Sequence, residues 1–118
     1  MAIKLIALDL DGTLLNSEKQ ITTRTKDIIA RAMARGVMVT IATGRMLRSA
    51  LYFARLIASD APVICCNGGY VGTAEGDPLF ARYFEPALTR EFLTFAYERS
   101  WYVNWYNGIE IYAPEYRA

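Results

Sequence analysis

The chain has 118 residues, of which 53% are hydrophobic and 21% are charged, and its formal net charge is +1. This composition is typical of a folded domain with a modest core, and it excludes a disordered chain. The sequence contains no histidine, which excludes Ser-His-Asp catalysis, Cys-His catalysis and a His-ligated zinc site within it. No basic run indicates nucleic-acid binding, and no apolar stretch approaches the roughly 18 residues of a membrane span. We therefore expect no nucleic-acid partner and no membrane partner.

Strands and helices alternate along the first half of the chain. An apolar run at residues 3–8 predicts a strand buried on both faces, and a loop follows to residue 20. Threonine N-caps, apolar periodicity and a glycine stop signal predict a helix from Thr22 or Thr23 to about Arg35. Similar signals predict a strand at 37–42, a helix at about 46–58 and a strand at 62–66. This alternation predicts right-handed crossovers, and therefore an α/β fold with a parallel sheet and flanking helices.

The pattern changes in the second half of the chain. Turn residues predict a hairpin of strands at 70–72 and 79–84, followed by a helix at about 88–99. Two more strands, at about 101–106 and 109–112, are predicted to be joined at Asn107-Gly108. We therefore expect two domains: residues 1–84 form an α/β core, and residues 85–118 begin a separate α+β module.

The two cysteines, Cys65 and Cys66, are adjacent in the sequence. A disulfide between neighbouring residues is geometrically strained, so we interpret both as reduced thiols in a buried strand. The first residues do not have the pattern of a signal peptide. These two observations predict a cytoplasmic protein.

The segment Asp9-Leu10-Asp11-Gly12-Thr13-Leu14 follows the first predicted strand. In open parallel sheets, ligands bind outside the carboxyl ends of the strands. Asp9 and Asp11 are two residues apart, so on an extended backbone they project to the same side. A cation such as Mg²⁺ would relieve their repulsion, while Gly12 permits a close approach of backbone to an anion and Thr13 adds a hydroxyl. These features suit phosphoryl transfer, with Asp9 attacking phosphorus and Asp11 acting as general acid and base.

The residues Leu8–Leu15 (Leu-Asp-Leu-Asp-Gly-Thr-Leu-Leu) resemble the first motif of the haloacid dehalogenase (HAD) superfamily, in its Cof-type sugar-phosphatase branch. The resemblance implies that Asp9 is the nucleophile and a Mg²⁺ ligand. It implies that Asp11 is the general acid/base, with its backbone carbonyl also on Mg²⁺. It further implies a HAD-like Rossmannoid core that is incomplete in this chain, and an inserted cap that begins near residue 84.

Two later segments match the same family in order and spacing. Thr43-Gly44-Arg45, at the end of the second predicted strand, is similar to the second motif. The Thr43 hydroxyl and the Gly44 N–H would bind the phosphoryl group at a helix N-terminus, and Arg45 would hold the substrate or a neighbouring loop. Asn67-Gly68-Gly69 is similar to the Asn-Gly-Ala segment of the Cof-type branch, which implies a substrate or loop contact at Asn67 and Gly68. A plain Asn-Gly turn is the alternative interpretation.

Two further motifs of the family have no counterpart here: a later lysine and a Gly-Asp-rich acidic pair. The three lysines, Lys4, Lys19 and Lys26, all precede the second motif. Loss of such electrostatic groups costs roughly 10²–10³ in rate per group in comparable enzymes. We therefore expect the chain by itself to have little phosphatase activity. A phosphomutase of the same superfamily and a non-catalytic module that binds Mg²⁺ or phosphate are the alternatives.

The complete enzyme is expected to hydrolyse small phosphorylated metabolites, with sugar phosphates as the first candidates. In the family, strands that follow the cap pair with the far side of the first strand. We therefore interpret the chain as a truncated product, or expect another copy to cover the apolar edge at 3–8. Such an edge is a template for self-association.

Overall fold

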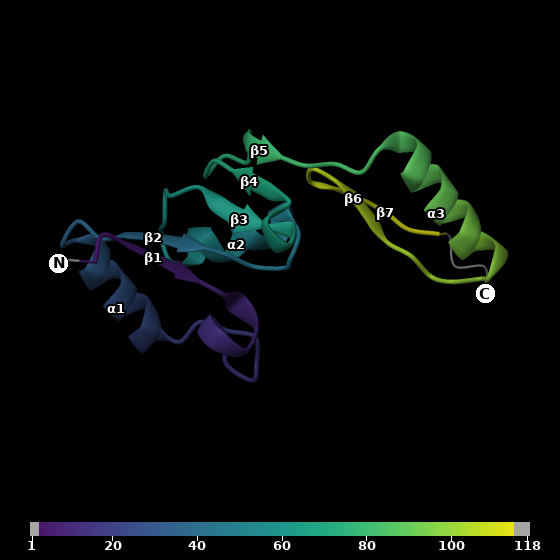
Figure 1. The fold of residues 1–118 in the computed structure, drawn as a ribbon. Helices are drawn as coiled ribbons and strands as arrows, with labels where there is room; N and C mark the ends of the chain where they lie inside the picture. Colours follow the sequence, from purple (N-terminus) through teal and green to yellow (C-terminus); the bar gives the residue numbers. More distant parts are fainter. Residues whose placement is uncertain (1–2, 115–118) are drawn as a thin grey trace. The chain divides into compact units, whose positions relative to one another are not determined.

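The computed structural model describes residues 3–114, so the ends of the two predicted domains, residues 1–2 and 115–118, lie outside the described residues. The chain divides into two compact units, Met1–Ala81 and Arg82–Ala118. Figure 1 shows the helices and strands of both units. Each unit is described by itself.

Unit 1 contains the predicted alternation of strands and helices, each slightly shorter than the sequence pattern indicated. Its elements are β1 (Leu5–Leu8), a turn (Leu10–Leu14), α1 (Thr23–Met33), β2 (Met38–Ile41), α2 (Leu47–Leu56), β3 (Val63–Cys65), a second turn (Cys66–Gly68), β4 (Tyr70–Gly72) and β5 (Pro78–Ala81). The α/β fold class is confirmed.

The three strands that precede the predicted ligand-binding loops run parallel. β1 pairs with β2 so that Leu8 lies opposite Ile41, and a parallel bridge between Ala42 and Ile64 places β3 beside β2. β4 pairs antiparallel with β3, and β5 pairs antiparallel with β4. The predicted hairpin extends the sheet of the core, because the turn Cys66–Gly68 reverses the chain directly onto β3.

The core of unit 1 lies between the sheet and its two helices. Fully buried side chains come from β2, α2, β3 and the first turn: Leu10, Val39, Ile41, Leu47, Val63 and Cys65. α1 packs on β2, and α2 packs on β2 and β3. Two successive right-handed crossovers in one direction place both helices on the same face of the sheet.

The prediction that the first strand is buried on both faces is wrong. Leu5 (53% exposed) and Ala7 are exposed, whereas Ile6 and Leu8 are half-buried and pack against the core. The cause is the placement of both helices on one face, which leaves the other face of β1 open. Within residues 3–114, β1 also pairs on one side only, with β2.

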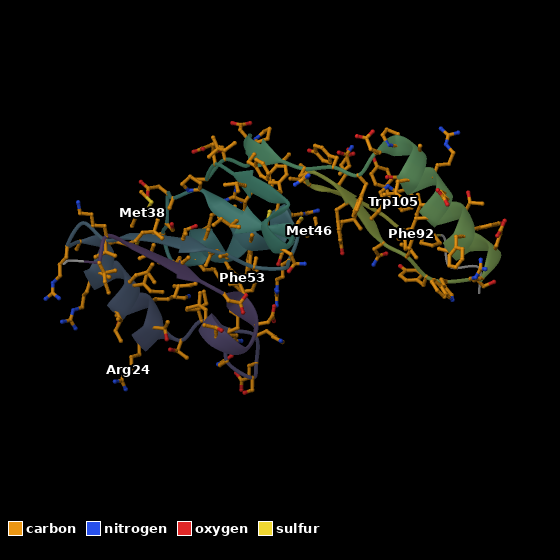
Figure 2. The ribbon with its side chains drawn as sticks, viewed as in Figure 1. Arg24, Met38, Met46, Phe53, Phe92 and Trp105 are labelled. Carbon is orange, nitrogen blue, oxygen red and sulfur yellow. The ribbon has the colours of Figure 1, made fainter. Side chains whose placement is uncertain are left out.

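Unit 2 consists of α3 (Pro86–Glu98) and the hairpin of β6 (Trp105–Asn107) and β7 (Glu110–Tyr112). β6 begins four residues later than predicted, and the turn lies at Gly108 and Ile109 because Asn107 already pairs with Glu110. Between residues 82 and 114 the aromatic side chains of this unit, among them Phe92 and Trp105 in Figure 2, remain exposed by 38% or more. The longest helix, α3, has 13 residues, and no helix within residues 3–114 is long and apolar enough to cross a membrane.

Candidate functional site

Three loops of unit 1 follow the carboxyl ends of three adjacent parallel strands. They carry all the sequence-predicted site residues: Asp9, Asp11, Gly12 and Thr13 after β1; Thr43, Gly44 and Arg45 after β2; Asn67 and Gly68 after β3. Backbone hydrogen bonds from Ala42 N to Leu8 O (2.8 Å) and from Thr43 N to Ile64 O (2.9 Å) tie the strand ends together. The topology therefore brings the three loops to one edge of the sheet, where ligands bind in folds of this kind.

The first loop is a tight turn that buries its leucines and exposes its polar residues. Backbone bonds from Leu14 N to Asp9 O (3.1 Å) and from Leu15 N to Leu10 O (2.9 Å) close it. Leu10 and Leu14 are buried in the core, while Asp9 and the residues that follow Leu10 up to Leu14 are exposed. Gly12 has φ +76°, a left-handed conformation that glycine adopts without steric cost. The alternation of leucine and aspartate thus anchors the turn and leaves both carboxylates at its surface.

Two cations converge on the carboxylate of Asp11. Arg45 donates from Nε to Oδ2 (2.7 Å) and from Nη2 to Oδ1 (2.8 Å), and Lys19 Nζ donates to the same Oδ1 (2.8 Å). Arg45 is itself held, because its Nη1 donates to Ser49 Oγ (3.2 Å) and its guanidinium lies 5.0 Å from the centre of the Phe53 ring. This arrangement connects the first loop to the second across 34 residues of sequence.

The hydrogen bonds to Asp11 change the acidity of both partners. The hydrogen bonds from Arg45 hold the pKa of the Asp11 carboxyl well below its usual range, and the hydrogen bond from Lys19 is the second largest cause. The same bond to Asp11 raises the pKa of Arg45. Asp11 is therefore ionised at neutral pH in this arrangement, although its 43% exposed side chain leaves the pairing partly screened by water.

The second and third loops interlock. Thr43 is buried (6% exposed), and its Oγ1 accepts a hydrogen bond from Arg45 N (3.2 Å). Cys66 N donates to Arg45 O (2.9 Å) and Asn67 N donates to Thr43 O (3.3 Å). A Cβ on Gly44 would lie 2.8 Å from Asn67 Oδ1, closer than side chains tolerate. Glycine at position 44 therefore allows the Asn67 amide to rest against the backbone of the second loop.

The donor set at this edge consists of oxygen atoms. No group of three or more His, Cys, Asp or Glu side chains that could hold a metal ion occurs within residues 3–114. Mg²⁺ is commonly held by one or two carboxylates, together with waters and substrate phosphate oxygens. The exposed carboxylate of Asp9 and the oxygens of Asp11 fit such an ion, but the Asp11 carboxylate is already paired with Arg45 and Lys19.

Sequence reasoning missed Lys19, Ser49 and Phe53. Lys19 was set aside because it precedes the second motif, yet it contacts Asp11. The turn-forming segment Asn16-Ser17 precedes Lys19 and folds the chain back toward the first loop, so it could have predicted that Lys19 lies near Asp11. Ser49 and Phe53 lie four and eight residues after Arg45, and that spacing would have placed them on the same face of α2.

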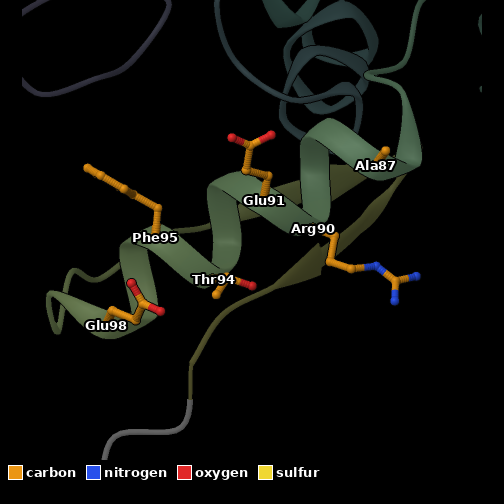
Figure 3. Close-up of a pocket in the computed structure, with 6 residues that line it drawn as sticks. All are labelled: Ala87, Arg90, Glu91, Thr94, Phe95 and Glu98. Atoms are coloured by element: carbon orange, nitrogen blue, oxygen red, sulfur yellow. The ribbon is translucent and has the colours of Figure 1, made fainter.

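A shallow depression elsewhere in the chain does not have the character of a site. Figure 3 shows that the six residues lining it all belong to α3: Ala87, Arg90, Glu91, Thr94, Phe95 and Glu98. Because one helix alone lines this depression, it is open to solvent and cannot surround a ligand. Small-molecule sites are concave and bury most of the ligand surface. The loops after β1, β2 and β3 remain the candidate site.

The sequence matches the haloacid dehalogenase-like hydrolases over residues 6–117. The chain belongs to this family. It is 42% identical over 71 residues to pyridoxal phosphate phosphatase YbhA of Escherichia coli (strain K12), covering 60% of this chain and 26% of the relative. It is 28% identical over 113 residues to phosphatase YwpJ of Bacillus subtilis (strain 168), covering 96% of this chain and 40% of the relative.

Solved structures of the family have the same fold. A haloacid dehalogenase-like hydrolase from Bacteroides thetaiotaomicron superposes with a TM-score of 0.88 at 25% identity, over 99% of this chain and 46% of its own. The family resemblance inferred from the motifs is confirmed. The chain spans 26% and 40% of the length of the two curated relatives.

Proposed function

We propose that this chain carries the nucleophile and part of the phosphate site of a phosphatase that acts on small phosphorylated metabolites through an aspartyl-phosphate intermediate on Asp9. The observation that carries the proposal is the meeting of Asp9, Asp11, Thr43 and Arg45 at one sheet edge in a haloacid dehalogenase-like hydrolase. The names of the relatives support phosphate-ester hydrolysis, because they are phosphatases.

The proposed reaction has two displacement steps. A carboxylate oxygen of Asp9 attacks phosphorus while the bond to the leaving oxygen breaks, and Asp11 gives that oxygen a proton. Water then attacks the phosphorus of the aspartyl phosphate, Asp11 takes its proton, and the bond to Asp9 breaks. Asp11 carries no proton while it is paired with Arg45 and Lys19, so this pairing must loosen before the first step.

Other residues of the three loops would bind and orient the phosphoryl group. Thr43 Oγ1 and the backbone N–H of Gly44 lie where β2 gives way to α2, and Gly12 and Thr13 lie on the facing turn. Asp9 and Asp11 would hold Mg²⁺, which would offset the charge of the phosphoryl group and the nucleophile. Asn67 and Gly68 would contact the substrate or support the second loop.

Beryllofluoride, a phosphoryl analogue that binds to aspartate carboxylates, tests the proposal directly. We expect the 118-residue chain to bind beryllofluoride with Mg²⁺, measured by ¹⁹F NMR, and Asp9→Asn to abolish that binding. Asp60→Asn is the matched control, because it removes the same charge from an exposed residue that precedes β3 and so lies at the opposite edge of the sheet. Binding that survives Asp9→Asn would refute the assignment of the nucleophile.

A non-catalytic module that binds Mg²⁺ or phosphate is the second candidate. One feature of the structure favours this candidate: Asp11 is paired with two cations and so is not free to act as an acid or base. In addition, no group of three or more metal-binding side chains lies within residues 3–114. Beryllofluoride or phosphate binding that Asp9→Asn leaves unchanged, without turnover of p-nitrophenyl phosphate, would support the non-catalytic module. Turnover that Asp9→Asn abolishes would support the phosphatase.

The domain assignment of residues 85–118, the substrate and the compartment are also proposals. Residues 85–118 would begin the cap, and sugar phosphates are the first substrates to test. Both cysteines are free, which accords with a reducing compartment such as the cytoplasm. We also propose that the open edge of β1 mediates self-association.

A further inference from the structure

The loop at residues 16–20 is closed around the side chain of Asn16. Asn16 Oδ1 accepts hydrogen bonds from the backbone N–H groups of Glu18 (3.1 Å) and Gln20 (2.8 Å). Backbone bonds from Asn16 N to Gln20 O and from Lys19 N to Asn16 O, both 3.0 Å, close the same loop. Lys19 has φ +59°, a left-handed conformation that costs a non-glycine residue about 1–2 kcal/mol. The loop therefore presents Lys19 in a defined and unfavourable backbone conformation.

The ammonium group of Lys19 reaches an oxygen that already has a partner. Its Nζ lies 2.8 Å from Asp11 Oδ1, which also accepts from Arg45 Nη2 at 2.8 Å. An isolated exposed ion pair contributes only about 0.2–1 kcal/mol. Here the pair belongs to a network, because Arg45 also donates to Ser49 and its guanidinium lies near the Phe53 ring.

The formal charges of four side chains in this part of the site cancel. Asp9 and Asp11 contribute two negative charges, and Arg45 and Lys19 contribute two positive charges. An incoming phosphate adds negative charge beside Asp9. Without Lys19 these side chains would carry one more negative than positive charge, which would weaken the attraction of the site for phosphate even with Mg²⁺ bound.

We propose that Lys19 is a positioning residue of the phosphoryl-transfer site, which together with Arg45 holds the Asp11 carboxylate before substrate binds and offsets the charge of a phosphate bound beside Asp9. This inference rests on the proposed function. It adds a residue from the loop before α1 to a site otherwise built from three strand ends.

The test compares Lys19→Gln with two matched variants of the full chain. Lys19→Arg keeps the charge on the loop. Lys26→Gln makes the same change in net charge on α1, at a lysine that forms no ion pair within the described part of the chain. Two quantities are measured: the dissociation constant for inorganic phosphate with Mg²⁺, and the rate at which the Arg45 Nε–H proton exchanges with water, by NMR.

We expect Lys19→Gln to weaken phosphate binding several-fold, because it removes one positive charge beside the bound anion. It should also speed exchange at Arg45 Nε, while the melting temperature stays near that of the wild type. Lys19→Arg should restore both values, and Lys26→Gln should change neither by as much as twofold. Equal effects of Lys19→Gln and Lys26→Gln would overturn the inference.

Failure of the proposed function would look different. If the wild-type chain binds neither phosphate nor beryllofluoride, the proposed function is refuted, and the Arg45 exchange rate alone then decides whether Lys19 fixes Asp11. Unchanged exchange in Lys19→Gln would refute the positioning role whatever the phosphate result.

Discussion

Asp9 and Asp11 are separated by one residue, yet their surroundings differ. Asp11 accepts three charge-assisted hydrogen bonds from Arg45 and Lys19, whereas Asp9 is exposed at the end of β1. A free carboxylate suits a nucleophile, and a held carboxylate suits a group that must face a fixed direction. The difference arises from Leu10, which is buried between them and sets the course of the turn.

At Asn67, backbone conformation and side-chain function can be separated by substitution. Asn67 has φ +54°, which asparagine and glycine tolerate better than other residues. We expect Asn67→Ala to lower the free energy of unfolding by about 1 kcal/mol, measured by urea denaturation. Asn67→Gly removes the same amide but should leave stability within about 0.5 kcal/mol of the wild type. Equal losses in the two variants would show that the amide, not the backbone, carries the stability.

Cys65 makes the stability of unit 1 sensitive to alkaline pH. Burial, followed by the neighbouring Cys66, raises the pKa of the Cys65 thiol from 9.0 to about 12. The folded state therefore favours the neutral thiol, so this contribution is fully present below pH 9 and is lost as the pH rises from 9 toward 12. We expect the stability of Cys65→Ala, measured by denaturation, to fall less across that range than that of the wild type. Cys66→Ala removes only the smaller contribution of the neighbouring thiol, so it should reduce this pH dependence less than Cys65→Ala does.

At the scale of elements, each helix of unit 1 begins in a different way. α1 has a side-chain cap, because Thr22 Oγ1 accepts from Thr25 N (3.2 Å). α2 has no side-chain cap at Met46, and its first turn follows the loop that carries Thr43. An N-terminus without a protein cap leaves N–H groups for an anion, which accords with the phosphate role proposed for that loop.

The cap of α1 provides a prediction with an adjacent control. Thr22→Ala removes the side-chain acceptor and should lower the free energy of unfolding by about 1 kcal/mol. Thr23→Ala changes the neighbouring exposed threonine, which is the first residue of the helix and is not its cap, and should have an effect within about 0.5 kcal/mol. Chemical denaturation of both variants measures the difference, and similar losses would mean that Thr22 does not cap α1 in solution.

At the scale of the whole molecule, the sequence predicted the order of elements better than their pairing. Apolar periodicity and N-cap residues located α1, α2 and the parallel strands, because these signals are local. Turn chemistry did not predict that β4 would pair with β3, since that depends on three successive left-handed residues, Cys66, Asn67 and Gly68. Asn67 and Gly68 indicated a turn, because both residues tolerate that conformation, but Cys66 gave no sign that it would adopt it as well.

In the candidate site, too, the sequence predicted which residues belong to the site but not the contacts between them. The motifs identified Asp9, Asp11 and Thr43 from their positions after strands. The contact between Asp11 and Arg45 spans 34 residues, and the contact with Lys19 depends on a loop closed by the side chain of Asn16. Both depend on tertiary geometry, which residue spacing does not encode.

The direction of β5 determines where the chain leaves unit 1. Tyr70 pairs with both Cys65 and Ala81, so β5 ends level with the end of β3, at the edge that carries the three loops. The next helix begins at Pro86, so the tether is only four residues long. A short tether keeps whatever follows it at a high effective concentration near its point of attachment. Insertions in residues 82–85 would lengthen this tether without changing any residue of the site.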